Sequence, residues 1–149
     1  MDFTGTLRTI LNRKGSAVSS ISPDATVYEA VARMAEEDIG ALAVLENHRL
    51  IGIFSERDYA RKVILLGRAS RDTTVREAMT HPAITVPPEE SVEDCMRLMI
   101  HRRNRHVLVV DRGELCGIVS IGDLVNSIIS AQAATIDHLT SYIAGGYPG

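Results

Sequence analysis

The string Gly-Ile-x-Ser-x-x-Asp occurs twice in this chain of 149 residues, at residues 52–58 and again at 117–123. In each copy a serine hydroxyl precedes a carboxylate by three residues. If the serine ends a strand and the aspartate lies in the first turn of a helix, both side chains lie beside unpaired backbone N–H groups. A carboxylate there can accept both hydroxyls of a ribose, and a helix N-terminus favours a phosphate. The motif could therefore hold a ribose and a phosphate.

A plain helix cap is the alternative interpretation of the same residues. In a capping box the hydroxyl accepts from the backbone N–H three residues on, and the acidic side chain bonds back. Ser55 with Asp58 and Ser120 with Asp123 both fit this pattern. For a single copy of the motif, the cap is the better interpretation.

The two motifs belong to an internal repeat. Residues 22–63 align with residues 87–128 at a constant offset of 65 without a gap, and nine of the 42 aligned pairs are identical. Such a duplication must be recognised before a fold is assigned. With only two copies, it indicates a paired domain and not a solenoid.

Each repeat contains the same predicted elements in the same order. A short β-prone run leads to a helix with a capping pattern and an apolar stripe, then to two apolar strands joined by a polar turn, then to a second helix. The predicted first-repeat elements are residues 17–21, a helix from Thr26, 41–45, 50–54 and a helix from Ser55; the second-repeat elements are 83–86, a helix from Ser91, 106–110, 115–119 and a helix from Ser120. The sequence thus predicts an α/β fold of the α+β type, with two units packed about a pseudo-two-fold axis.

Segments outside the repeats complete the domain division. The predicted parts are an N-terminal helix in 1–15, the first repeat in 16–66, a connector in 67–82, the second repeat in 83–130, and a C-terminal helix and tail in 131–149. Leu7 and Ile10 share one helical face, and Ile136, Leu139 and Ile143 share another. These faces could pack on the chain's own repeats or on a second subunit, and the sequence leaves both open.

Composition excludes several classes of protein. The net charge is −3, no tryptophan is present and aromatic residues make up 4% of the chain, so neither a large nucleic-acid surface nor an anionic membrane is an expected partner. The short basic cluster at residues 102–106 stands near a predicted helix end, where cations are favourable. Two cysteines without metal spacing, and no leader or membrane-spanning run, indicate a cytoplasmic protein.

The duplicated motif at the end of the third strand resembles the signature of CBS (cystathionine-β-synthase) domains. The resemblance covers roughly residues 16–130, as a stand-alone tandem pair. It implies a regulatory module that binds AMP, ADP, ATP, NAD(H) or S-adenosylmethionine in clefts between the repeats, and that commonly forms flat homodimers. With two copies in register, ribose binding is favoured over a plain cap.

The resemblance implies two clefts that differ. The better site would take its phosphate contacts from the strand start at Arg105 and His106, its ribose contacts from the second motif, and its adenine contacts from small or apolar positions of the first repeat. Its candidate residues are Ser19, Ile21, Ala25, Ile39, Gly40, Ala41, Arg105, His106, Ser120, Gly122 and Asp123. The second site is more polar and crowded, and its candidates are Ser55, Arg57, Asp58, Thr85, Cys95 and Asn104.

The expected function is ligand sensing without turnover. The sequence has no phosphate-binding glycine loop with lysine, no clustered carboxylates for a metal and no activated nucleophile, so neither catalysis nor a metal is expected. AMP is the favoured ligand, and an unidentified partner protein would read the occupancy. The main alternative is a ligand-independent interaction or dimerisation scaffold; an enzyme or a nucleic-acid binder is less favoured.

Overall fold

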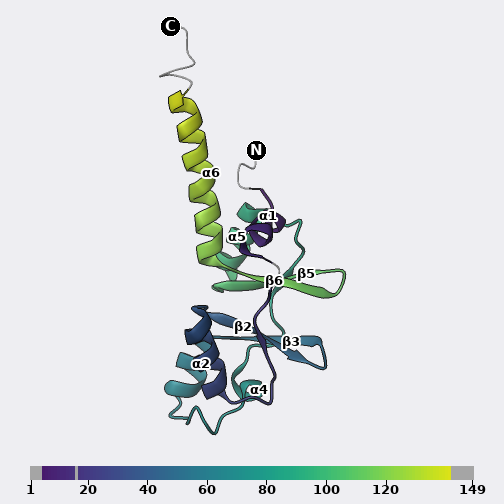
Figure 1. Cartoon of the computed structure of the whole chain (residues 1–149). Coiled ribbons are helices and arrows are strands. Elements are labelled where there is room, and N and C mark those ends of the chain that lie inside the picture. The colour runs from purple at the N-terminus through teal and green to yellow at the C-terminus, as the bar shows by residue number, and fades with distance from the viewer. Residues whose placement is uncertain (1–4, 16, 142–149) are drawn as a thin grey trace.

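The computed structural model describes the backbone of residues 5–15 and 17–141, with side chains through residue 132. Two similar units lie one above the other (Figure 1). The first unit contains β1 (Ser20–Ile21), α2 (Val27–Glu37), β2 (Ala41–Glu46), β3 (Arg49–Ser55), α3 (Glu56–Tyr59) and the π-helix η1 (Ala60–Ile64). The second contains β4 (Thr85–Val86), α5 (Val92–Arg102), β5 (His106–Asp111), β6 (Glu114–Ser120) and α6 (Ile121–Ser141). The predicted α+β fold and order of elements are confirmed.

Each unit has a three-stranded sheet, in the order β1-β2-β3 or β4-β5-β6. The short first strand pairs in parallel with the middle strand, and the other two strands form an antiparallel hairpin. The registers are equivalent, because Ile21 pairs with Val44 and, 65 residues later, Val86 pairs with Val109. The repeat found in the sequence is therefore a repeat of backbone structure.

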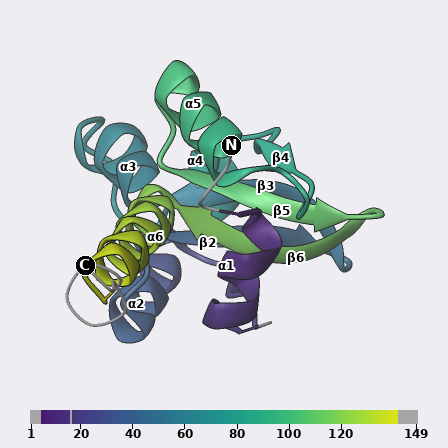
Figure 2. The ribbon, with the colours of Figure 1, turned by 90° about the horizontal axis from the view of Figure 1, so that it is seen from above.

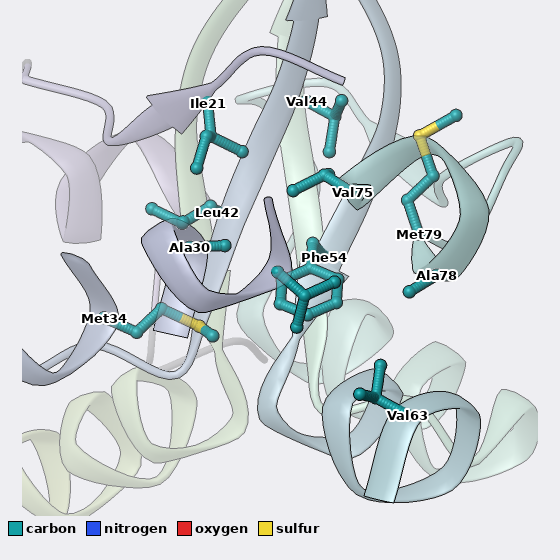
Figure 3. Packing of buried hydrophobic residues seen from close by; sticks show 11 residues of the cluster. Ile21, Ala30, Met34, Leu42, Val44, Phe54, Val63, Val75, Ala78 and Met79 are labelled. Atoms are coloured by element: carbon teal, nitrogen blue, oxygen red, sulfur yellow. The ribbon is translucent and has the colours of Figure 1, made fainter. Parts of the chain in front are cut away.

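Alternation along the middle strands separates two packing faces. Leu42 and Val44 of β2 point into the core of the first unit, together with α2 and Phe54 of β3 (Figure 3). Ala41 and Ala43 point the other way, into a cluster that contains Leu108 of β5. That cluster joins the units through equivalent positions of both sheets, as the predicted pseudo-two-fold packing requires.

The long helix of each unit begins and ends as its sequence indicates. Thr26 Oγ1 accepts from the Glu29 N–H at 3.1 Å, and Ser91 Oγ accepts from the Asp94 N–H at 3.0 Å. Met34 and Met99 are buried in the two cores, as expected of an apolar stripe. Ile100, which the spacing also assigns to the stripe, is instead 64% exposed because it lies on the outer edge of α5 in its last turn.

Two short helices ahead of the repeats cross over to the opposite unit. Helix α1 (Leu7–Lys14) precedes the first unit but buries Leu7 and Ile10 in the core of the second. Helix α4 (Val75–Ala78) precedes the second unit but buries its apolar residues in the core of the first. In Figure 2, α1 lies against β6. The open question about α1 is thereby answered, since it covers its own chain.

The sequence analysis sets a boundary between the second repeat and a C-terminal helix at residue 130. Helix α6 continues unbroken across that position to Ser141. Its C-terminal part extends away from the two units (Figure 1). The predicted apolar face of Ile136, Leu139 and Ile143 lies outside the side chains that the structure describes. Among the described residues, no helix is both long and apolar enough to span a membrane.

Candidate functional site

Both copies of the serine–aspartate motif form the geometry of a helix cap. At the junction of β3 and α3, the Ser55 N–H donates to Asp58 Oδ2 at 2.9 Å and the Asp58 N–H donates to Ser55 Oγ at 3.2 Å. At the junction of β6 and α6, the Ser120 N–H donates to Asp123 Oδ2 at 2.8 Å and the Asp123 N–H donates to Ser120 Oγ at 3.1 Å. Capping therefore uses Oδ2 of the carboxylate in each copy, and the further partners of each carboxylate distinguish what the two aspartates can bind.

The other oxygen of Asp58 has partners within the chain. Thr80 Oγ1 donates to Asp58 Oδ1 at 2.7 Å, and Lys62 Nζ lies 3.1 Å from the same atom. Lys62 also donates to the Met79 carbonyl at 3.2 Å, which ties the lysine to the connector. The Asp58 side chain is only 9% exposed. This carboxylate belongs to a closed network that holds the connector on the first unit.

Asp123 is more open and has a different cation. Lys14, the last residue of α1, donates through Nζ to Asp123 Oδ2 at 2.7 Å and to the Ile118 carbonyl at 3.0 Å. The Asp123 side chain is 21% exposed, more than twice the value for Asp58. Burial opposes ionisation, but the hydrogen bonds from Lys14 and Ser120 and the lysine charge outweigh it and lower the pKa of Asp123. The carboxylate is therefore ionised at neutral pH and available at the surface of a cavity.

A cavity of about 360 Å³ lies between the two units beside Asp123. Seven of the eleven residues proposed for the better site line it: Ser19, Ile39, Gly40, Ala41, His106, Ser120 and Asp123. Its remaining lining residues are Leu11, Lys14, Gly15, Ala17, Val18, Asp38, Gly117 and Ile118. The first unit thus supplies mainly small and apolar groups together with Ser19 and Asp38, and the second supplies Ser120, Asp123 and the imidazole of His106.

Four predicted residues of this group do not line the cavity. Ile21 is buried in the core of the first unit, and Ala25 packs against that core. Arg105 is exposed, and its carbonyl oxygen accepts from the Ile121 N–H at 2.9 Å at the start of α6. Gly122 is exposed in the first turn of α6. Sequence spacing predicts that these residues lie near the motif, but it does not predict the direction of each side chain.

The residues proposed for the second site lie in different surroundings. Cys95 is fully buried in the core of the second unit, where desolvation raises the pKa of its thiol to about 11. Thr85 is exposed on β4, and Arg57 donates to the Arg103 carbonyl. The cavity beside Asp123, and a second cavity lined by residues of α1 together with Pro88 and Cys116, are lined by none of the six: Ser55, Arg57, Asp58, Thr85, Cys95 or Asn104.

His106 faces Gly40 across the cavity. A Cβ atom at Gly40 would lie 3.3 Å from His106 Nε2 and 2.9 Å from Glu56 Oε1, so the missing side chain makes room for the imidazole. Burial and the positive charges of Lys14 and Arg105 lower the pKa of His106, while nearby carboxylates oppose the shift. The imidazole is therefore neutral at pH 7, and Lys14 is the cation that lines the described cavity.

Lys14 is the residue that the sequence analysis missed. A signal existed, because Thr6-Leu7-Arg8 matches Thr74-Val75-Arg76 at an offset of 68 instead of 65. The match is structural as well: Arg8 pairs with Glu89 and Asp111, and Arg76 pairs with the equivalent acids of the first unit, Asp24 and Glu46. The repeat thus includes the crossing helices, with a change of register between them and the strands.

A duplicated strand-helix-strand-strand-helix unit with a cavity between its copies defines a paired tandem-repeat module. The CBS domain family matches residues 15–64 and 75–130 of this chain. The chain therefore belongs to the CBS domain family, as a tandem pair, a class of module whose general role is regulation and signalling.

Known relatives have the same organisation. The mitochondrial CBS domain-containing protein CBSX3 of Arabidopsis thaliana is 38% identical over 151 residues, which cover 95% of this chain and 73% of that protein. A solved structure from Burkholderia ambifaria, named as a candidate signal-transduction protein with CBS domains, has 44% identity and a TM-score of 0.81 over 84% of this chain and 94% of that one. A hexameric CBS-CP12 protein from bloom-forming cyanobacteria has 28% identity and a TM-score of 0.74, over 95% of this chain and 89% of that one.

Proposed function

We propose that this CBS pair binds an adenosine-containing ligand, AMP first among them, in the cavity at Asp123 and signals its occupancy to a partner protein. The observation that carries the proposal is an ionised carboxylate at a helix N-terminus that faces a cavity between the repeats. The carboxylate can accept ribose hydroxyls, and the N-terminus of α6 favours a phosphate.

The size and lining of the cavity favour a mononucleotide. A volume of about 360 Å³ is near the lower end of the range for small-molecule sites, about 300–1,000 Å³. Val18, Ile39 and Ala41 offer apolar contacts for a base on the side of the first unit. AMP therefore fits the cavity better than NAD(H), and ADP, ATP and S-adenosylmethionine are less favoured alternatives.

The function requires binding and no turnover. Within the described residues, no three histidine, cysteine or acidic side chains form a group that could hold a metal ion. Asp123 is paired with Lys14, and the neutral imidazole of His106 also lines the cavity. Among the described residues, no hydroxyl or thiol of the lining is hydrogen-bonded to that imidazole. The ligand should leave unchanged, and the two free thiols suit a reducing compartment such as the cytoplasm.

Calorimetric titration of AMP tests the proposal directly, with adenosine, ADP, ATP, NAD⁺, NADH and S-adenosylmethionine as competitors and GMP as the control. Asp123→Asn should weaken AMP binding by about tenfold or more, since it removes a charge-assisted hydrogen bond to the ribose. Asp58→Asn is the matched variant, and it should lower the melting temperature but keep the affinity. Equal losses in the two variants would contradict the assignment of the site.

A ligand-independent scaffold is the second candidate. It is favoured by exposed apolar side chains, among them Leu65 at 76% in the turn after η1, Ile100 at 64% on α5 and Ile129 at 57% on α6. Such side chains are suited to a homodimer or a protein partner. This candidate predicts normal self-association and no binding of any adenine compound.

A further inference from the structure

The cation of the cavity comes from outside the repeat that holds Asp123. In the first unit, Asp58 pairs with Lys62 four residues later on the same helical segment. The position equivalent to Lys62 in the second unit is Ser127, which is buried. The second unit thus has no lysine of its own at this place, and Lys14 of the crossing helix α1 pairs with Asp123 instead.

The helix that carries Lys14 is firmly placed, whereas the lysine side chain can move. Leu7 and Ile10 are buried in the second core, and Leu11 packs over Gly117. The Lys14 side chain is 43% exposed. A four-carbon stem with a compact ammonium can change partners without any movement of the helix.

A ribose bound at Asp123 would share its carboxylate with Lys14. Lys14 Nζ and the Ser120 N–H both donate to Asp123 Oδ2. A ribose diol that approaches Asp123 would take over part of that carboxylate, and the ammonium would then lose acceptor strength from its main partner. A phosphate at the adjacent N-terminus of α6 would give the ammonium a new anionic acceptor.

The charges around the cavity also favour a contact between Lys14 and the phosphate. Asp38 and Asp123 line the cavity as acids, His106 is neutral at pH 7, and Lys14, the cation among the described lining residues, offsets one of the two negative charges. Without Lys14, the lining would repel a phosphate. If Lys14 left Asp123 when a nucleoside without a phosphate bound, the ammonium would have no equivalent anionic partner.

Resting on the proposed function, we propose that Lys14 determines specificity: it exchanges Asp123 for the phosphate of the bound ligand and so selects a nucleoside monophosphate over the parent nucleoside. The ligand class is thereby narrowed to adenosine compounds with a phosphate on the ribose. The selectivity comes from helix α1, which lies ahead of both repeats.

Titration of AMP and adenosine into the full chain tests the role of Lys14. Lys14→Met should weaken AMP binding by about tenfold while adenosine binding is unchanged or stronger, because one charge-assisted contact is lost and a competitor for Asp123 is removed. Lys14→Arg should restore most of the preference for AMP. Arg13→Met is the matched control, since Arg13 is the neighbouring exposed cation and does not line the cavity.

The outcomes separate this inference from the function on which it rests. If Lys14→Met changes AMP and adenosine binding by the same factor, or changes neither, Lys14 does not hold the phosphate and the inference is wrong while the nucleotide site stands. If neither compound binds the folded wild type or any variant, the proposed function fails and the specificity role fails with it. Melting curves without ligand establish that each variant is folded.

Discussion

At the scale of single residues, the same motif has two outcomes because its neighbours differ. Asp58 is enclosed by Thr80 and Lys62, which come from the connector and from its own helical segment. Asp123 meets only Lys14 and the cap of its own helix among the hydrogen bonds described here. Asp58 therefore stabilises the first unit, whereas Asp123 lies at a cavity.

Glycine in the motif allows close approach of the crossing segments. A Cβ at Gly52 would lie 2.7 Å from the Thr80 carbonyl oxygen, and a Cβ at Gly117 would lie 2.4 Å from Leu11 Cδ2. Thr80 is bound to Ile53 through two backbone hydrogen bonds, so its carbonyl cannot easily move, whereas Leu11 can change rotamer. Gly52→Ala should lower the free energy of unfolding by about 1–3 kcal/mol and Gly117→Ala by less.

Urea denaturation of the two glycine variants measures this difference. Each variant adds a single methyl group at an equivalent position, so each serves as the control for the other. A larger loss of stability for Gly117→Ala would show that the Leu11 contact is the more rigid of the two.

The lowered pKa of His106 makes stability dependent on pH. The unfolded chain takes up a proton near the ordinary pKa of 6.5, and the folded protein does so only at lower pH. The contribution of the neutral imidazole is therefore fully present above pH 6.5 and is lost as the pH falls through the folded pKa. Between pH 7.5 and 5.5, the melting temperature of the wild type should therefore fall by more than that of His106→Gln.

Differential scanning calorimetry across this range checks the effect. His48→Gln is a suitable control, because His48 is exposed in the turn between β2 and β3. Parallel pH profiles for the wild type and His106→Gln would show that the imidazole titrates normally in the folded protein.

At the scale of elements, each unit depends on a helix that precedes the other one. Backbone hydrogen bonds fix both crossings, from the Leu7 N–H to the Glu90 carbonyl at 3.0 Å and from the Val27 N–H to the Thr73 carbonyl at 2.8 Å. Helix α1 thus closes the second core and also carries Lys14 to the cavity. Helix α1 therefore contributes both to the packing of the second core and to the lining of the cavity.

Removing the anchor of α1 should unsettle the whole second unit. Leu7 is fully buried, so Leu7→Ala should cost about 2–5 kcal/mol through lost burial and a cavity. Ile64→Ala, at a residue that is 53% exposed, should stay within about 0.5 kcal/mol. Chemical denaturation measures both, and a small loss for Leu7→Ala would mean that α1 contributes little to the second core.

Much of this element structure could be predicted from the sequence, because local patterns define it. The offset of 65, the apolar runs at 41–45 and 50–54 with a polar turn between them, and the hydroxyl caps at Thr26 and Ser91 all led to elements that the structure confirms. The crossing of α1 could not be predicted in this way, since its partner lies some 80 to 120 residues away and its register differs by three. For the same reason, the sequence allowed the Asp123 site to be ranked above the Asp58 site but did not reveal the neighbours that distinguish the two aspartates.

At the scale of the whole molecule, helix α6 of the second unit exposes apolar side chains. Val125 is 41% exposed and Ile129 is 57% exposed. Exposed apolar groups of this kind favour contact with another protein surface. The homodimer proposed for this CBS pair would use such helices.

Replacing Ile129 tests the proposed homodimer. Light scattering after size exclusion should give about twice the chain mass of 16.2 kDa for the wild type. Ile129→Glu should shift the protein towards the monomer, because a charge would be buried without a partner at the contact. Ser130→Glu, at the next exposed position, is the matched control. A monomeric wild type, or an unchanged mass for Ile129→Glu, would argue against a contact through α6.

The crossing of α1 also has a consequence for the order in which the protein matures during translation. Leu7 is synthesised before the first unit, yet it shares a core with Leu124, which leaves the ribosome more than a hundred residues later. Domains generally fold from the N-terminus as synthesis proceeds. Here the first unit, with α4 in place, can fold while the nascent helix α1 waits for the second unit to emerge. Helix α1 can therefore dock only after the strands and helices of the second unit have been synthesised, and the cavity gains its lysine at that point.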